Sequence, residues 1–443
     1  MTDQPAVRDA PGSARVSSAY ARYALGVLFV VTLLNFLDRQ IMAILAEPIK
    51  NDLNLTDTQI GLMTGFSFAL FYTTLGVPIA LLADRWHRPK IIGLSLAIWS
   101  GFTILCGMAV NFTLLFAARV GVGIGEAGSG PAAQSLLANL FPPEKRAGVL
   151  GIYGMSVPLG AFIAYTGGGW VLQNFDWRMA FLLAGAPGLI FAAVVWFTIR
   201  EPRKPTPLSQ AFKPLAGQLT FMQAFKELAV KPAYRQLIAA GVILQFVAYG
   251  FASFQVSYFV RVHGIGAPGG DWDFATMGLA LGVMIGLSGM FGSLSGGWVA
   301  DRVRKWGLGW TLVAPAIVLM VSTPLFALGL HQEQAIWAVV LFAAPTLAAT
   351  FYYGPTFAAV QLLARDETRA VAVSVYLLIA GLIGMGLGPL FVGVLSDFFA
   401  SRGESGGGGL THALTVLTLF NIWAGLHFFL AARRLQRDTA GGR

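Results

Sequence analysis

Charged residues are scarce in this sequence, and cysteine is nearly absent. Asp, Glu, Lys and Arg make up 12% of the 443 residues, whereas 56% are apolar. A soluble domain carries about 25% charged residues, so this chain lacks the charge that a water-exposed surface needs. Its single cysteine, Cys106, excludes a disulfide framework and a zinc cluster of cysteines. Composition therefore excludes a soluble multidomain protein and favours one that lies in a membrane.

Motifs of nucleotide and metal chemistry are also missing. The string G-x-G-x-x-G at Gly123, Gly125 and Gly128 lies inside an apolar stretch, whereas a dinucleotide site needs it between a strand and a helix. No phosphate-binding G-x-x-x-x-G-K-[ST] string occurs, and the five histidines are scattered. We therefore expect no cofactor and no bound metal. The chain also shows no set of nucleophile and base, which disfavours a membrane-embedded lipid enzyme.

Long apolar stretches dominate the sequence instead. There are twelve, each of 21 to 30 residues, and each is long enough to cross a bilayer as a helix. The sequence therefore predicts an all-α membrane protein with twelve transmembrane helices. The stretches are 22–46, 59–83, 89–110, 112–141, 147–172, 179–199, 234–262, 274–299, 308–330, 335–364, 370–397 and 410–432.

Basic residues predict the orientation of these helices. The net charge is +9, and the excess lies in alternate loops, which indicates membrane orientation rather than a nucleic-acid surface. With the N-terminus in the cytoplasm, 24 Lys and Arg residues lie on the cytoplasmic side and only Lys50, Arg178, Arg261 and Arg402 lie outside. Both termini are therefore predicted to be cytoplasmic. The short outer loops and the compact chain suggest a bacterial inner membrane.

The longest connector, residues 200–233, is basic and contains proline, and it separates six apolar stretches from six. We interpret it as a cytoplasmic linker between two half-transporters. The expected organisation is a tail at 1–21, a six-helix half at 22–199, the linker at 200–233, a second half at 234–432 and a tail at 433–443.

The two halves share a short motif. The chain reads ALLADRWHRPK at 80–90, after the second stretch, and GWVADRVRK at 297–305, after the eighth. The first copy resembles the cytoplasmic loop motif of the major facilitator superfamily, with Ala80 and His87 in place of two glycines. The strings ARVGVGIGEAG at 118–128 and GMSVPLG at 154–160 are similar to further motifs of that superfamily. The resemblance implies the major facilitator fold, with two pseudo-symmetric six-helix halves, and a monomer.

A narrower resemblance is to the Spinster family, whose members are bacterial and animal transporters linked to lysophospholipids and sphingosine phosphate. It implies a lipid-like cargo. The string N-[FY]-x-D-R at 35–39 also resembles organic-anion symporters of the same superfamily, so both cargo classes remain open. The strings similar to Spinster are LLNFLDRQ at 33–40, ADRWHRPK at 83–90, ARVGVGIGEA at 118–127 and REPRK at 200–204.

Four charges lie inside the apolar stretches and away from their ends: Asp38, Arg39, Arg119 and Glu126. A charge at membrane depth costs at least about 2.5–3.5 kcal/mol, so these groups should face the interior and form pairs. At a rise of about 1.5 Å per residue, Asp38 and Arg119 lie at similar depths, which favours a pair between them. A static salt bridge needs one pair and not four charges. We therefore assign Asp38 and Glu126 to proton coupling, and Arg39 and Arg119 to the charge partner of an anionic substrate.

The second half offers aromatic side chains instead of charges. We expect Tyr249, Phe254, Tyr352 and Tyr353 to line the cavity opposite the four charges. Such a cavity suits an amphiphile, with an anionic head group at the arginines and an acyl tail along the aromatic wall. Packing alone also explains any single one of these aromatic residues.

The resemblance to the superfamily also implies a cytoplasmic gate made of Asp84, Arg85, Asp301 and Arg302. Asp84 is expected to approach the positive N-terminal end of the eleventh helix, and Asp301 that of the fifth helix, near Arg146. These contacts would close the cytoplasmic side in the outward-open state.

We therefore predict a secondary transporter and not an enzyme. It moves a lysophospholipid-like or sphingosine-phosphate-like amphiphile by alternating access, coupled to protons. The expected partners are this amphiphilic or anionic substrate, protons and membrane lipids, and not nucleic acid. The alternatives are a proton-coupled organic-anion symporter, a membrane-embedded lipid enzyme, which is disfavoured, and a channel, which would lack the repeated gate motif.

Overall fold

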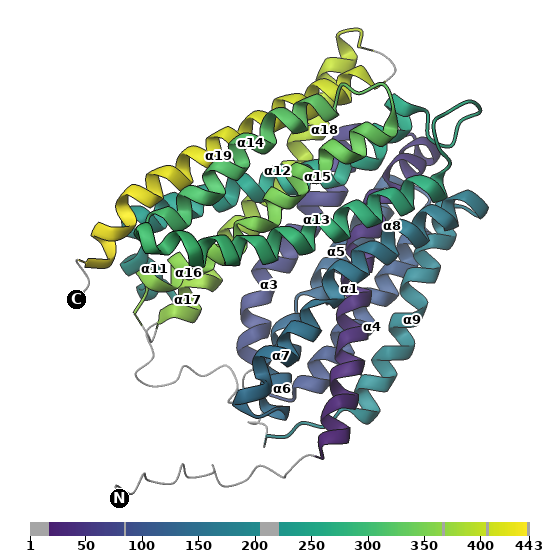
Figure 1. Cartoon of the computed structure of the whole chain (residues 1–443). Coiled ribbons are helices and arrows are strands. Elements are labelled where there is room, and N and C mark those ends of the chain that lie inside the picture. The colour runs from purple at the N-terminus through teal and green to yellow at the C-terminus, as the bar shows by residue number, and fades with distance from the viewer. Residues whose placement is uncertain (1–16, 84–85, 204–220, 366–367, 405–406, 441–443) are drawn as a thin grey trace, which may run out of the picture.

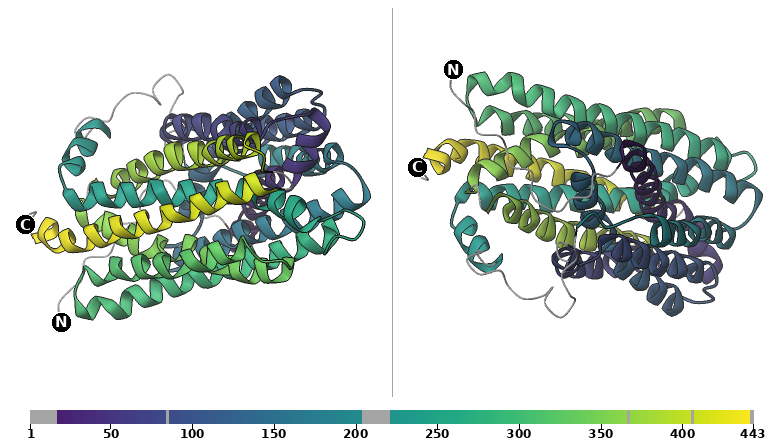
Figure 2. Two further views of the ribbon diagram at one scale, coloured as in Figure 1. Left: turned by 90° about the horizontal axis from the view of Figure 1, so that it is seen from above. Right: turned by 90° about the horizontal axis from the view of Figure 1, so that it is seen from below.

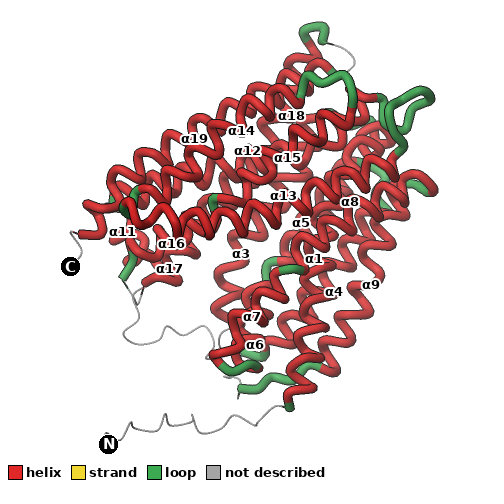
Figure 3. The backbone as a smooth tube through the Cα atoms, viewed as in Figure 1, coloured by secondary structure: helices red, strands yellow, loops and turns green. Residues whose placement is uncertain are grey.

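The structure is a computed structural model that describes residues 17–83, 86–203, 221–365, 368–404 and 407–440. These residues form helices and contain no strand (Figure 3). Ten helical segments are long and apolar enough to cross a membrane. Two further segments, 57–83 and 112–140, are helical but are divided by a π-helical turn and by a short break, respectively. The twelve crossings that hydropathy predicts, and the all-α membrane fold, are confirmed.

The first six crossings carry single or divided helices. They are α1 (Ser18–Leu53); α2 (Asp57–Gly61) with the π-turn η1 (Leu62–Phe66) and α3 (Ser67–Ala83); α4 (Arg88–Gly107); α5 (Phe112–Glu126) with α6 (Ser129–Leu140); α7 (Pro143–Gly154) with α8 (Ser156–Asn174); and α9 (Trp177–Thr198).

The last six crossings follow a short helix, α11 (Phe221–Ala229). They are α12 (Pro232–His263); α13 (Phe274–Val303) with the turn η2 (Arg304–Trp306); α14 (Trp310–Gly329); α15 (Ala335–Phe351) with α16 (Tyr353–Leu363); α17 (Arg369–Ile379) with the π-turn η4 (Ala380–Met385) and α18 (Gly386–Ser401); and α19 (Gly408–Ala440).

Polar residues at the loop borders fix where several helices begin. The side chains of Ser17, Asn111, Asp176 and Asp273 each accept a hydrogen bond from the backbone N–H three residues later, at the start of α1, α5, α9 and α13. Such a cap satisfies a backbone donor that has no partner inside the helix. The caps therefore mark helix starts that hydropathy alone places only approximately.

Several helices extend past the apolar stretches that predicted them. The first helix continues from 46 to Leu53, and the last from 432 to Ala440. The connector, expected as a plain linker, contains α11. Hydropathy detects the membrane-embedded part of a helix, whereas backbone hydrogen bonding continues through charged residues such as Lys and Arg, which favour helix.

The two halves meet at one end of the molecule and diverge toward the other (Figure 1). The start of α1, the described part of the connector and the end of α19 all lie where the halves diverge, which we call the linker end. At the opposite end, glycines allow close packing between the halves. Gly61 packs against the backbone of Pro389, and Gly278 against that of Tyr165. Figure 2 shows the same helices from above and from below.

A buried ion pair fixes the start of the connector to the first half. Arg88, at the first turn of α4, is fully buried, and Glu201 accepts hydrogen bonds from its Nε, at 3.0 Å, and from its Nη2. Its Nη1 donates to the carbonyl of Ser135, at 2.7 Å, and to Asn139, at 2.9 Å, both on α6. The Nη2 of Arg203 donates to the carbonyl of Ala83, at 3.0 Å. The connector therefore ties together the ends of α3, α4 and α6.

This arrangement predicts a pH-dependent loss of stability in Glu201→Gln. Burial raises the pKa of a carboxyl group, but the hydrogen bonds from Arg88 outweigh it and hold the pKa of Glu201 below its usual value. Glutamine leaves the buried guanidinium without a counter-charge, so we expect a loss of about 3 kcal/mol at pH 7. The stabilisation is complete at neutral pH and is lost as the pH falls from about 4.3 through the lower folded-state pKa.

Equilibrium unfolding in detergent at pH 7 and at acidic pH measures this difference. The difference in free energy of unfolding between the parent and Glu201→Gln should be large at pH 7 and shrink on acidification. The exposed Glu144, on α7, provides the control, and Glu144→Gln should change stability by no more than about 0.5 kcal/mol. An equally stable Glu201→Gln variant at pH 7 would contradict the proposed anchor.

Candidate functional site

The four membrane-embedded charges come together between the first and fourth crossings. Asp38 and Arg39 lie on α1, and Arg119 and Glu126 lie on α5. Asp38, Arg119 and Glu126 are each at most 2% exposed, and the side chain of Arg39 is 12% exposed. Charges this deeply buried are stable only if they are paired.

Arg39 pairs with Glu126. The Nε of Arg39 lies 2.8 Å from Oε2 of Glu126. The guanidinium also lies over three aromatic rings, 4.2 Å from the ring centre of Tyr72, 4.8 Å from that of Phe68 and 5.2 Å from that of Phe36. Ring faces attract a cation, so Arg39 is held both by charge and by stacking. The sequence predicted that both residues face the interior but did not predict this pair.

Asp38 lies beside Arg119, as their equal depths predict, but the pair is loose. The distance from Nη1 of Arg119 to Oδ2 of Asp38 is 3.9 Å, which is too long for a hydrogen bond. The other carboxylate oxygen of Asp38 accepts a hydrogen bond of 2.8 Å from the hydroxyl of Thr103. Asp38 is therefore positioned by Thr103 and is paired only electrostatically with Arg119.

Several polar atoms of this cluster have no hydrogen-bond partner in the part of the chain that the structure describes. They are Oδ2 of Asp38, Nε and Nη1 of Arg119, and Oε1 of Glu126. Buried polar atoms in proteins are almost always hydrogen-bonded. With all four groups ionised the cluster is neutral, and it has unused donors and acceptors, which water, a proton or an anionic ligand can occupy.

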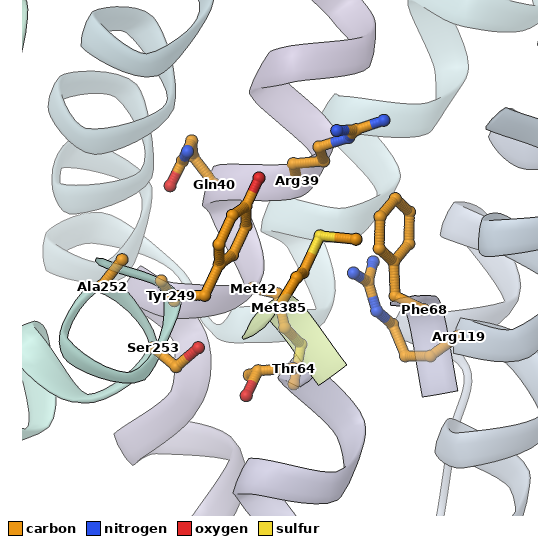
Figure 4. A pocket seen from close by; sticks show the side chains of 11 residues that line it. Arg39, Gln40, Met42, Thr64, Phe68, Arg119, Tyr249, Ala252, Ser253 and Met385 are labelled. Carbon is orange, nitrogen blue, oxygen red and sulfur yellow. The ribbon is translucent and has the colours of Figure 1, made fainter. Parts of the chain in front are cut away.

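A cavity lies next to the cluster, between the two halves. Figure 4 shows Arg39, Phe68 and Arg119 on one side of it and Tyr249, Ala252 and Ser253 on the other. Its volume is about 40 Å³, which holds a few waters but is far below the ~300–1,000 Å³ of ligand pockets. The lining residues are Arg39, Gln40, Met42, Ala43, Thr64, Phe68, Arg119, Tyr249, Ala252, Ser253 and Met385.

Of the four aromatic residues expected to line the cavity, Tyr249 does so in this conformation. Phe254 is fully buried in the apolar core. Tyr352 is also buried, and its ring stacks on that of Tyr353 with ring centres 4.6 Å apart. For Phe254, Tyr352 and Tyr353, a role in lining the cavity stays a prediction.

The expected cytoplasmic gate lies at the linker end, where the halves diverge. Asp84 and Arg85 fall outside the described residues. Asp301 is exposed, and the Nε of Arg146 donates instead to the carbonyl of Phe141, at 3.2 Å. Since the gate contacts were expected for a state in which this end is closed, the gate stays a prediction.

A second charge cluster, which the sequence did not predict, joins the halves at the opposite end. Arg261 of α12 donates to both carboxylate oxygens of Glu47 on α1, at 2.9 and 2.7 Å. It also donates to both oxygens of Asp57 on α2, at 2.7 Å each. Asp57 further accepts from Lys50, at 2.6 Å, and from Ser396 of α18, at 2.6 Å. We call these residues, together with Asp397, the clasp.

Asp397 of α18 completes the clasp by capping the N-terminus of α2. Its carboxylate accepts from the backbone N–H of Asp57, at 3.0 Å, and from that of Thr58, at 2.8 Å. It also accepts from the hydroxyl of Thr58, at 2.6 Å. A carboxylate is favoured there because the N-terminus of a helix carries a partial positive charge. The clasp was missed because charges at the ends of apolar stretches were treated as loop residues.

Known proteins resemble this chain over nearly its whole length. Residues 28–389 match the Major Facilitator Superfamily. An MFS-type efflux pump of Mycolicibacterium smegmatis is 31% identical over 94% of this chain and 93% of its own. Protein spinster homolog 1 of Xenopus tropicalis is 24% identical over 93% of this chain and 80% of its own. The hexuronate transporter of Bacillus subtilis is 28% identical over 63% of this chain and 64% of its own.

A solved structure shows the same fold. It is that of a bacterial homologue of the human lysosomal transporter Spinster in an inward-facing, unoccupied conformation. Its TM-score is 0.82 at 30% identity, over 96% of this chain and 99% of that one. Twelve crossings in two halves, a buried charge cluster beside the cavity between them, and these similarities agree. The chain therefore belongs to the Major Facilitator Superfamily, and it is a membrane transporter with a Spinster-like structure.

Proposed function

We propose that this transporter carries a lipid-like amphiphile, of the lysophospholipid or sphingosine-phosphate type, and couples its movement to protons. The observation that carries the proposal is the buried charge cluster, which is neutral but retains unused donors on Arg119 beside the interhalf cavity. An anionic head group would use these donors, and an apolar tail would follow the aromatic side chains of the second half. Similarity to a probable sphingolipid transporter, spinster homolog 1 of Arabidopsis thaliana, supports this cargo class.

An organic-anion symporter is the second candidate. The specific observation in its favour is similarity to a hexuronate transporter and a probable L-galactonate transporter. The arginines would hold a carboxylate as well as a phosphate, because both anions accept paired hydrogen bonds from guanidinium. Binding of the purified protein to lysolipids, sphingoid phosphates and small sugar acids, followed by counterflow in liposomes, separates the two candidates. Counterflow of the sugar acids alone would exclude the lipid cargo.

The orientation follows from charge. We infer that the linker end faces the cytoplasm of a bacterial cell, since basic residues concentrate in the segments at that end. With this orientation, the clasp closes the outer side while the cytoplasmic ends of the halves lie apart. The cavity must then widen toward the cytoplasm before an amphiphile fits, and alternating access requires the clasp to open in turn.

Proton coupling would work by competition for the arginines. With all four groups ionised, the cluster is neutral. Protonation of Glu126 weakens its hold on Arg39, and protonation of Asp38 weakens its attraction to Arg119. Either event leaves a positive charge that favours an anionic head group, and release of the proton restores the internal pair. Proton and cargo are thus linked through shared partners.

The first prediction concerns the proton. Asp38→Asn and Glu126→Gln should each abolish the part of uptake that a pH gradient drives, because an amide side chain does not take up and release a proton as a carboxyl group does. The protein should stay folded and still bind cargo. Uptake into proteoliposomes with and without an imposed gradient measures this. Glu333→Gln, in an exposed loop, serves as the control and should respond like the parent. A Glu126→Gln variant that still responds fully to the gradient would place the proton site elsewhere.

The second prediction concerns the head group. Arg39→Lys and Arg119→Lys should each weaken transport about tenfold or more, since lysine keeps the charge but loses the forked pair of donors. The Michaelis constant for uptake and direct binding of cargo measure the effect. Parent-like transport by both variants would mean that the arginines only balance buried charge.

The third prediction concerns the clasp. Arg261→Gln removes the cation between Glu47 and Asp57. We therefore expect the two halves to separate at the end of the molecule where the clasp lies. Loss of one partner of a buried ion pair costs about 3 kcal/mol or more, which shifts the ratio of closed to open states on the order of a hundredfold. Distances between spin labels at the clasp ends of α2 and α18 should lengthen.

The matched control is Arg178→Gln. Arg178 pairs with Asp52 at 2.7 Å at the same end, but both lie within the first half, on α9 and α1. Its loss should leave the distances between the halves unchanged. If Arg261→Gln gives the parent's distance distribution, the clasp does not hold the closed state.

A further inference from the structure

An exposed surface rich in arginine and tryptophan lies at the linker end of the second half, away from the cavity. It is built by the end of α13, the turn η2, the start of α14 and the end of α19. We call it the basic–aromatic surface; its members are Trp298, Arg302, Arg304, Lys305, Trp306, Trp310, Arg433, Arg434 and Arg437, all exposed.

Cations and rings on this surface are paired with each other. The guanidinium carbon of Arg302 lies 3.6 Å from the ring centre of Trp298, one turn earlier on α13. The Nζ of Lys305 lies 5.4 Å from the ring centre of Trp306, and the rings of Trp306 and Trp310 meet edge to face at 5.9 Å. Stacking covers one face of the planar guanidinium of Arg302, and the N–H groups at its edge can still bind an anion.

The end of α19 adjoins this group. Helices α14 and α19 lie side by side (Figures 1 and 2), and Gly309, just before α14, packs against the backbone of Ala432. The next residue, Arg433, places its guanidinium carbon 4.7 Å from the ring centre of Phe429. The basic residues around η2 and those at the end of α19 are far apart in sequence, and the contact between Gly309 and Ala432 brings them together.

These cations contact rings but have no acidic partner among the side chains that the structure describes. None of the six basic residues of the surface forms an ion pair with a residue whose side chain the structure describes. In contrast, Arg39, Arg88 and Arg261 each hold a carboxylate. The acidic neighbour described at this surface is Asp301, which is itself exposed. Six basic residues stand in these segments against two acidic ones, Asp301 and Asp438, so the surface has an excess of positive charge that favours an external anion.

The approach to the surface along α13 is apolar. Met290, Leu294 and Trp298 are exposed, at 46%, 66% and 58%, and they precede Arg302 at intervals of four residues. Residues four apart share one face of a helix. This face thus presents a stripe of apolar side chains that ends in a cation, on a helix that crosses the membrane.

We propose that the basic–aromatic surface binds an anionic phospholipid from the surrounding bilayer. The acyl chains lie along the stripe of α13, and the phosphate lies among the basic residues of η2 and α19. Tryptophan rings are favoured at the level of lipid head groups, which places these cations next to lipid phosphates. A soluble anion would use the cations but not the stripe. This lipid is a partner distinct from the cargo, since none of the residues of this surface lines the cavity beside the charge cluster.

Native mass spectrometry of the full-length protein tests the proposal, with equal amounts of phosphatidylglycerol and phosphatidylcholine. The parent should bind phosphatidylglycerol preferentially. Each basic residue near an anionic surface strengthens attraction about fivefold. The double variants Arg304→Gln/Lys305→Gln and Arg433→Gln/Arg434→Gln should therefore each lower the ratio of bound phosphatidylglycerol to phosphatidylcholine at least about fivefold. Arg302 is kept because it is also a predicted gate residue.

The control is Arg402→Gln. Arg402 lies over the exposed ring of Phe398, 4.6 Å from its centre, at the clasp end. It should leave the lipid ratio unchanged. Unfolding temperatures check that the variants fold, which is expected because the replaced side chains are exposed and form no ion pair among the described side chains. A parent-like ratio in either double variant overturns the proposal. Displacement of the lipid by excess inorganic phosphate also overturns it, in favour of a soluble anion.

Discussion

Pairing of buried charge is the constraint on which the rest of this structure depends. An isolated charge inside a membrane is too costly to keep, so each deeply buried charge must meet an opposite one. Three clusters satisfy this rule at three levels. Arg88 holds Glu201 at the linker end, the cluster of Asp38, Arg39, Arg119 and Glu126 lies midway, and the clasp lies at the opposite end. Helix packing brings these partners together. The need for each buried charge to have a partner in turn limits how the helices can be arranged.

Much of this could be predicted from the sequence, because hydropathy reports membrane crossings directly. Twelve crossings, the interior position of the four charges and the proximity of Asp38 to Arg119 all follow from apolar length and helical rise. The pair of Arg39 with Glu126 does not, since long side chains reach partners at other depths and rotation of one helix against another is set by packing. The clasp was missed because Glu47 and Arg261 lie where apolar stretches end, and the helices continue past those ends.

The cap of Asp397 on α2 is the counterpart, at the opposite end, of a contact that the sequence predicts for Asp84. Sequence motifs predicted an aspartate of the second crossing, Asp84, against the N-terminus of the eleventh at the linker end. At the opposite end, the structure has the reciprocal arrangement, with Asp397 of the eleventh crossing on the N-terminus of the second. The same two crossings thus carry an acid and a helix N-terminus each. Rocking of the halves would exchange one cap for the other, which would keep the free energies of the two states similar.

The clusters differ in how completely their hydrogen bonds are satisfied, and this difference separates their roles. Arg88 and Arg261 donate from all three guanidinium nitrogens, which makes those pairs costly to break and suited to holding helices. Arg119 has two nitrogens without a partner among the described residues, and it faces a carboxylate at 3.9 Å. An arginine whose hydrogen bonds are already used gains little from a ligand, whereas Arg119 gains new bonds from one. Under the proposed function, cargo that binds the unsatisfied donors of Arg119 beside the interhalf cavity would therefore change the balance between states.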